Sequence, residues 1–153
     1  MPFLIRPCRH LSLAYVSGFF LLIAVLLLSN GPAHAEWVVV AEAGKKREDK
    51  MTVYVDPETI RRKGDLVNVW VLFDYDLVQR SGEGASSFMY LSNRHQEQFD
   101  CVEERSRWLA AAYISGNMGE GEVVFSKDGE SNWKAVHPQS VGQAVWKRAC
   151  GMK

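Results

Sequence analysis

The stretch LVNVWVLFDY, residues 66–75, decides the fold because its apolar residues recur with a period of two. This is the period of a β-strand, whose successive side chains point to opposite faces of a sheet. One face is predicted to lie in the core because all of its members are apolar or aromatic: Val67, Val69, Val71, Phe73 and Tyr75. The other face is half apolar, which predicts a central strand whose second face is also covered.

The residues that need this second cover are Trp70 and Leu72. Three covers are open: the C-terminal helix, a loop, or a second subunit. In the last case Trp70 and Leu72 would lie in the interface of a homodimer.

Further antiparallel strands are predicted because short apolar runs alternate with turn residues along the chain. The predicted strands cover residues 36–43, 51–55, 66–75, 87–101, 106–115 and 122–127. The last three are expected to form a meander, although three consecutive alanines leave a helix open for 106–115. Asp56 before Pro57 predicts one helical turn, and the glycine-containing residues 76–86 predict a mobile loop.

A helix is predicted from residue 141 to about residue 150. Ser140 can cap its start, and Lys147 and Arg148 lie near its end, where the helix dipole favours positive charge. One helix face is expected to pack on the sheet: Val141, Gly142, Val145, Trp146, Ala149 and Cys150. The predicted fold class is therefore α+β, an antiparallel meander of about six strands with a C-terminal α-helix packed on it.

Residues 1–35 have the three regions of a secretory signal peptide. Arg6 and Arg9 precede a long apolar run, and a Gly-Pro breaker and Ala-His-Ala then favour cleavage after Ala35. The alternative is a retained membrane anchor, since the apolar run is about the minimum length for spanning a bilayer. We expect cleavage, no membrane span afterwards, and a single domain over residues 36–153.

Export would leave two cysteines, Cys101 and Cys150, in an oxidising compartment where thiols pair. We therefore predict one disulfide between them. Two separate buried thiols are the alternative, and a redox-active pair is disfavoured because the chain has no Cys-x-x-Cys spacing.

The sequence predicts no catalytic residues and no metal ligands. His95 and His137 are the histidines beyond the leader, and neither has the spacing of a zinc site, so both are predicted to lie on the surface. No Gly-x-Ser-x-Gly elbow marks a nucleophile, and no Cys-x-x-Cys-His motif marks a haem. No residue can be assigned to a cofactor, and we expect none to be bound.

Charge and aromatic content bear on the partner. The chain has 18 basic and 18 acidic residues, and the leader holds two of the arginines, so the remainder is slightly acidic and nucleic acid is not an expected partner. Two basic clusters are interpreted as solvated surface: Arg61, Arg62 and Lys63, and Arg105 with Arg107. The five tryptophans are interpreted mainly as core, with one or two at an interface.

A family resemblance is carried by Tyr54-Val55-Asp56, Trp70, Asp74-Tyr75, Asp100-Cys101, Trp133, Pro138 and Cys150, in this order. In these motifs nearly all of residues 36–153 resembles the surface-adhesin protein E family. The resemblance implies an exported six-stranded antiparallel sheet with a C-terminal helix, in a Gram-negative bacterium. The adhesin that names the family also dimerises and binds host extracellular-matrix proteins and haem, but none of its binding residues has a motif that transfers to this chain.

The functional prediction is an exported, non-enzymatic binding module, located in the periplasm or on the outer cell surface of a Gram-negative bacterium. Its expected partner is a protein, and host matrix proteins are the class that the resemblance implies. A periplasmic, envelope-associated structural protein is the alternative, and a small secreted hydrolase is the third candidate.

Overall fold

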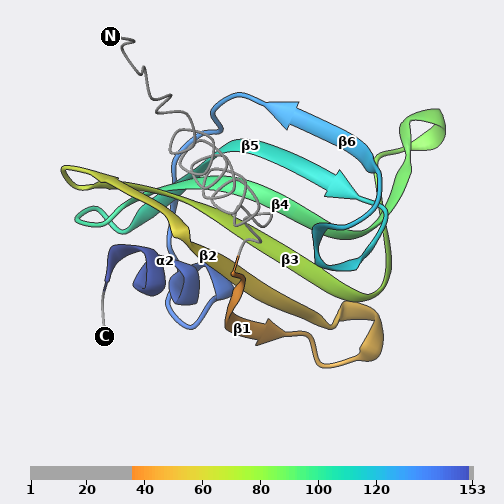
Figure 1. Cartoon of the computed structure of the whole chain (residues 1–153), viewed down its shortest axis with the longest axis horizontal. Coiled ribbons are helices and arrows are strands. Elements are labelled where there is room, and N and C mark those ends of the chain that lie inside the picture. The colour runs from red at the N-terminus through yellow and green to blue at the C-terminus, as the bar shows by residue number, and fades with distance from the viewer. Residues whose placement is uncertain (1–35, 152–153) are drawn as a thin grey trace, which may run out of the picture. The chain divides into compact units, whose positions relative to one another are not determined.

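The computed structural model describes residues 36–151, excepting the side chain of Asp49. Its strands and helices follow one another along the chain (Figure 1): β1 Val38–Ala43, η1 Arg47–Asp49, β2 Met51–Lys63, β3 Leu66–Ser81, η2 Gly84–Ser86, β4 Phe88–Asp100, β5 Arg105–Ile114, η3 Asn117–Gly119, β6 Val123–Asp128, β7 Lys134–Ala135 and α2 Val141–Cys150. All strand pairs are antiparallel, in the order β1-β2-β3-β4-β5-β6, and the short β7 also pairs with β5. The predicted α+β class and the meander are thus confirmed.

The central strand has the two faces that its sequence predicts. We call the face of Val67, Val69 and Val71 the helix face, because α2 packs on it, and the face of Asn68 and Trp70 the open face. The core lies between the sheet and α2 and contains Val53, Val55, Val67, Val69, Val71, Phe99, Val145, Trp146 and Ala149. The helix contacts mainly β1 to β4 and leaves β5 and β6 to one side (Figure 1).

The start of α2 agrees with its predicted cap. The Ser140 side chain accepts a hydrogen bond of 3.1 Å from the backbone N–H of Gln143, which satisfies a donor that has no partner within the helix. At the other end Gly151 adopts φ +75°, the left-handed conformation that ends many helices.

The predicted helical turn after Asp56 is wrong. Strand β2 continues to Lys63 through a bulge between Asp56 and Arg61. The Asp56 carboxylate accepts the N–H of Glu58, as an N-cap would, but Thr59 donates to the Asp56 carbonyl and accepts the N–H of Trp70 on β3. The cap-like residue therefore stabilises a bulge, because pairing with β3 outweighs the local preference for a turn.

The predicted mobile loop at 76–86 is also wrong over most of its length. Strand β3 extends to Ser81, and after a register shift Gln79, Arg80 and Ser81 pair with the start of β4. The connection to β4 is left to residues 82–87. The low apolar content of 76–81 reflects the exposed end of a hairpin, which needs backbone pairing but little burial.

Residues 105–114 form a strand, so the helix that their alanines left open is excluded. The two faces of this strand do not follow one continuous alternation, because Ala110 pairs with Gln96 while Trp108 pairs with Glu97. Leu109 is thus an extra residue, a β-bulge that reverses the alternation on one side of it. As a result Trp108, Ala111 and Tyr113 share the helix face.

Cys101 and Cys150 are joined by a disulfide, as predicted, across a sequence separation of 49 residues. The bond connects the turn after β4 to the last residue of α2. The predicted signal peptide falls on residues 1–35, which lie outside the described part of the chain. Within residues 36–151 no helix is both long and apolar enough to cross a bilayer.

Candidate functional site

The helix face carries a cluster of rings beyond the core that packs on α2. This aromatic cluster consists of Phe73, Tyr75, Phe88, Tyr90, His95, Trp108, Tyr113 and Phe125. Phe88 and Phe125 are stacked, with ring centroids 4.8 Å apart and planes inclined by 7°. Most of the other pairs meet edge to face or tilted, the arrangements that aromatic quadrupoles favour.

His95 lies at the bottom of this cluster and is only 5% exposed, so its predicted surface position is wrong. Its ring is 5.1 Å from Phe73 and 4.4 Å from Trp108 between centroids. Strand β4 is paired on both sides, with His95 opposite Val71 and Ala111, and this central position buries it. Neither ring nitrogen has a hydrogen-bond partner among the described residues, and the nearest carboxylate oxygen, of Glu97, is 3.8 Å from Nδ1. His137 is exposed, as predicted.

Two tyrosines of the cluster, Tyr90 and Tyr113, are held in their neutral form. Burial raises the pKa of Tyr90 to about 12, and the neighbouring hydroxyls of Tyr75 and Tyr113 add to the shift. Burial also raises the pKa of Tyr113, again with a contribution from Tyr75. A phenolate at either position would have to be desolvated among other phenols, so Tyr90 and Tyr113 stay uncharged at neutral pH.

A pocket of about 220 Å³ opens beside the aromatic cluster, between β5 and β6. Its apolar walls include Trp108, Tyr113 and Phe125, and Lys127 and Glu130 lie at its polar side. Sequence reasoning did not single out Phe125, because residues 122–127 were interpreted only as a strand. The signal that could have identified Phe125 was the run of three apolar residues in a short segment between two turns.

Strand β6 forms the free edge of the sheet next to this pocket. It is last in the strand order, and all six of its residues are exposed. Val123, Val124 and Phe125 remain 54%, 38% and 43% exposed. An edge strand with unpaired backbone groups and apolar side chains is a surface that other chains can pair with.

On the open face, a loop covers Leu72. The segment around η3 folds back over the sheet, where Ser92 donates a 2.6 Å hydrogen bond to the Gly116 carbonyl and accepts one of 3.0 Å from the Gly119 N–H. The Asp74 carboxylate accepts the N–H of Met118 at 2.6 Å. Leu72 is fully buried within the single chain, so the predicted interface with a second subunit is left with Trp70 alone.

Trp70 is half-buried on the open face. Of the three covers left open for Trp70, the C-terminal helix is excluded, because α2 packs on the opposite face of the same strand. The apolar face of α2 packs on the fully apolar valine face instead, because it removes more apolar surface from water there than it would on the mixed open face.

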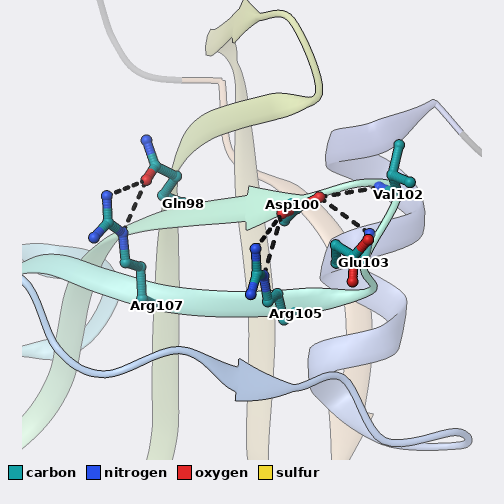
Figure 2. A network of polar contacts seen from close by, with 6 residues as sticks. All are labelled: Gln98, Asp100, Val102, Glu103, Arg105 and Arg107. Carbon is teal, nitrogen blue, oxygen red and sulfur yellow. Dashed lines mark hydrogen bonds and ion pairs between the residues drawn. The ribbon is translucent and has the colours of Figure 1, made fainter.

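The basic residues of β5 are paired rather than simply solvated. The Asp100 carboxylate accepts hydrogen bonds from the N–H groups of Val102 and Glu103 and from the Arg105 guanidinium (Figure 2). These donors, the Glu103 N–H first, hold the pKa of Asp100 below its usual value although partial burial opposes them. The Asp100 side chain therefore closes the turn between β4 and β5 as an anion.

Arg107 continues this array along the open face. Its guanidinium donates two hydrogen bonds, of 2.9 and 2.7 Å, to the Gln98 side-chain oxygen (Figure 2) and also pairs with Glu130. Gln98 in turn donates to Asn68 at 2.8 Å. The ring of Trp133 lies 5.0 Å from the Arg105 guanidinium and 4.6 Å from that of Arg107, so the loop before β7 is held by cation–π contacts.

The tryptophans are distributed differently from the prediction that most of them are core. Only Trp146 is buried, Trp108 is 41% exposed, and the other three are intermediate. Among residues 36–151 no group of three metal-ligating side chains comes together. The side chains that the structure does gather are aromatic on one face and amide, guanidinium and indole groups on the other.

Comparison with known families supplies the classification. The family model of surface-adhesin protein E matches residues 37–151. The chain belongs to the surface-adhesin protein E family. This match confirms the resemblance seen in the sequence motifs.

Solved structures of Haemophilus influenzae protein E share the fold of this family member. One matches with a TM-score of 0.53 at 12% identity, covering 78% of this chain and 86% of that chain. Crystal form II matches with a TM-score of 0.51 at 13% identity, covering 65% and 80%, and protein E of non-typeable H. influenzae matches with a TM-score of 0.51 at 12% identity, covering 78% of each chain. At these identities the likeness shows the fold alone. No curated protein sequence matches this chain significantly.

Proposed function

We propose that this adhesin-family domain is an exported, non-enzymatic binding module that engages a protein partner along the free edge of β6. The observation that carries the proposal is the combination of an edge strand whose six residues are all exposed with the aromatic pocket beside it. Host extracellular-matrix proteins are the partner class that we favour, because the family is that of a surface adhesin.

The edge of β6 suits an extended segment of another protein. Backbone groups on the outer side of the strand are available for pairing, which provides affinity without sequence specificity. The pocket between Trp108 and Phe125 lies beside this edge and can take one large apolar side chain of the added segment, which provides specificity. The opposite edge, β1, is less accessible because α2 packs against it.

A localisation on the outer cell surface follows from the proposed function, since a host protein must reach β6. The periplasm remains the location if the partner is a component of the bacterial envelope. Fractionation of the bacterium, with antibody labelling of intact cells, separates the two locations.

The test uses the protein as the cell processes it, purified and exposed to a panel of immobilised extracellular-matrix proteins. Val123→Lys places a charge on the β6 edge, and Val39→Lys is the matched control because Val39 is 52% exposed on β1. We expect Val123→Lys to weaken binding about tenfold or more and Val39→Lys to leave it unchanged, with circular dichroism of both like that of the wild type.

Equal loss in both variants, or binding that Val123→Lys does not affect, would overturn the assignment to β6. Co-purification with envelope components and no binding to any matrix protein would favour the envelope-associated role instead. Turnover of a substrate that a single serine or histidine substitution abolishes would replace the binding module by an enzyme.

A further inference from the structure

The open face has a second candidate ligand site, centred on Trp70 and separate from the β6 edge. Two pockets meet at this side chain. One, of about 270 Å³, is lined by Thr59, Arg61, Asn68, Val69, Trp70 and Gln96. The other, of about 200 Å³, is lined by Trp37, Asp56, Trp70 and Arg94. Trp70 is thus the wall that the two pockets share.

The bulge in β2 creates this arrangement. Trp70 pairs with Asp56 on one side and with Gln96 on the other, but the next pair on β2 is Arg61 with Asn68. The four residues between them leave the plane of the pairing, and Thr59 returns to accept the backbone N–H of Trp70 at 3.0 Å. Because the bulge is fixed by hydrogen bonds, the space on both sides of Trp70 exists before any ligand binds.

The polar groups around Trp70 are mainly amides and guanidinium groups, which are planar and carry either no charge or a positive charge. Asn68 and Gln96 supply amides to one pocket, and Arg61 and Arg94 supply one guanidinium to each. Nε of Arg94 is buried and has no hydrogen-bond partner among the described residues.

The two pockets together hold two guanidinium groups and one carboxylate, and Arg61 Nη1 also donates to the carbonyls of Glu58 and Ile60. Asp56 is the one carboxylate among the lining residues, and its Oδ1 already accepts the N–H of Glu58. The site therefore favours a ligand with hydroxyl groups and a negative charge.

Backbone recognition is not available here, which argues against an extended peptide. At Trp70 and Gln96, strands β3 and β4 pair with neighbours on both sides, so their backbone N–H and C=O groups are already occupied. A ligand at Trp70 must be recognised by side chains alone. An indole ring that stacks on the C–H face of a pyranose, with amides and guanidinium groups directed to its hydroxyls and carboxylate, is the side-chain chemistry that sugars require.

We propose that the open face at Trp70 binds an acidic oligosaccharide, with one sugar ring on each side of the indole and a carboxylate facing Arg94 or Arg61. Two sources share this chemistry: uronate-containing glycans of a host matrix and the muramate-containing glycan strands of the bacterial envelope. The site lies on the face opposite the aromatic cluster, so it is independent of the proposed protein partner.

Calorimetric titrations of the purified, cell-processed protein test the proposal with three probes. These are a hyaluronan hexasaccharide, a tetrasaccharide of peptidoglycan glycan, and cellohexaose as the neutral control. We expect at least one acidic probe to bind about tenfold or more tightly than cellohexaose, and its affinity to fall as salt is raised. The acidic probe that binds more tightly identifies the source.

Variants separate the Trp70 site from other surfaces. Trp70→Ala should reduce the affinity for the acidic probe about tenfold or more, whereas Trp108→Ala, an exposed tryptophan on the opposite face, should leave it unchanged. Arg94→Gln should reduce the preference for the acidic probe over cellohexaose. If Trp70→Ala does not fold, Gln96→Ala, at a half-buried side chain beside the ring, takes its place.

Three outcomes would overturn the proposal. The first is that neither acidic probe binds the folded wild type at millimolar concentration. The second is that binding persists in Trp70→Ala or Gln96→Ala. The third is that Trp108→Ala loses as much binding as Trp70→Ala. If the protein binds no saccharide but forms a dimer, and Trp70→Glu dissociates that dimer, this face would be assigned to a second copy of the chain instead.

Discussion

The carbonyl oxygen of Cys150 accepts a hydrogen bond of 3.0 Å from the Arg62 guanidinium, which also approaches Sγ of Cys101 to 3.8 Å. The end of β2, the turn after β4 and the last residue of α2 therefore meet at one place. Only one of the links there is covalent, and the Arg62 contacts are exposed to water. The disulfide should accordingly contribute most of the stabilisation at this junction.

Removal of the disulfide is expected to destabilise the fold. Cys101→Ser with Cys150→Ser should lower the free energy of unfolding by about 2–4 kcal/mol, because the unfolded chain is no longer constrained by the cross-link. Urea denaturation measures this change. Arg62→Ala is the control and should lose no more than about 1 kcal/mol, as an exposed contact does; equal losses would assign the junction to Arg62 instead.

Stability at acid pH is expected to depend on Asp100. Its pKa is lowered in the folded protein from the ordinary 3.8, so the unfolded chain binds the proton first as the pH falls. The stabilisation is present above that value and is lost as the pH falls toward the folded pKa. In unfolding experiments from about pH 6 to about pH 3, Asp100→Asn should therefore reduce the loss of stability with acid. Asp128→Asn, at an exposed residue of β6, should not; identical slopes for wild type and Asp100→Asn would contradict this role.

The raised pKa of Tyr90 in the aromatic cluster can be measured by spectroscopy. Tyr90 should ionise with a pKa of about 12 rather than at the ordinary 10.0, because its phenolate would be desolvated in the cluster. A raised folded pKa means that this contribution to stability is present below pH 10.0 and is lost as the pH rises through about 12. NMR titration of ¹³C-labelled tyrosine, assigned with Tyr90→Phe, measures it, and a midpoint near 10.0 would show that Tyr90 is solvated.

The cap of α2 should have a measurable effect. Ser140→Ala removes the acceptor of the Gln143 N–H and should lower the free energy of unfolding by about 1 kcal/mol. Ser126→Ala, on the exposed strand β6, is the matched control and should leave stability nearly unchanged. If both variants unfold at the wild-type denaturant concentration, the cap adds nothing to the stability of the domain.

The sequence predicts this fold well where local pattern and tertiary packing agree. The alternation in residues 66–75 identifies the central strand and its buried valines, and Ser140 marks the start of α2 to the residue. It predicts less well where pairing outweighs local preference. Asp56 and Pro57 have the chemistry of a helix start, yet β3 holds them in a bulged strand.

The candidate sites were harder to predict because they depend on which strands are neighbours. Neither the burial of His95 nor the meeting of Phe88, Tyr113 and Phe125 in one aromatic cluster has a local signal, since these residues meet only through the register of β3 to β6. The sequence did identify Trp70 as an apolar residue that needs a cover on the second face of β3. The face that α2 covers could not be read from the sequence, because both faces of β3 carry apolar residues.

The extra residue at Leu109 makes β5 two half-strands that are out of phase with each other. Each half places its own set of side chains through its own register with β4: Arg107 toward Gln98, and Tyr113 toward the aromatic cluster. Because Glu97 and Gln96, the partners of Trp108 and Ala110, are consecutive on β4, removal of Leu109 would restore regular pairing and leave Trp108 and Ala110 on their present faces. Substitutions along β5 can therefore change what either face recognises, whereas deletion of Leu109 would keep the side chains of both faces in place.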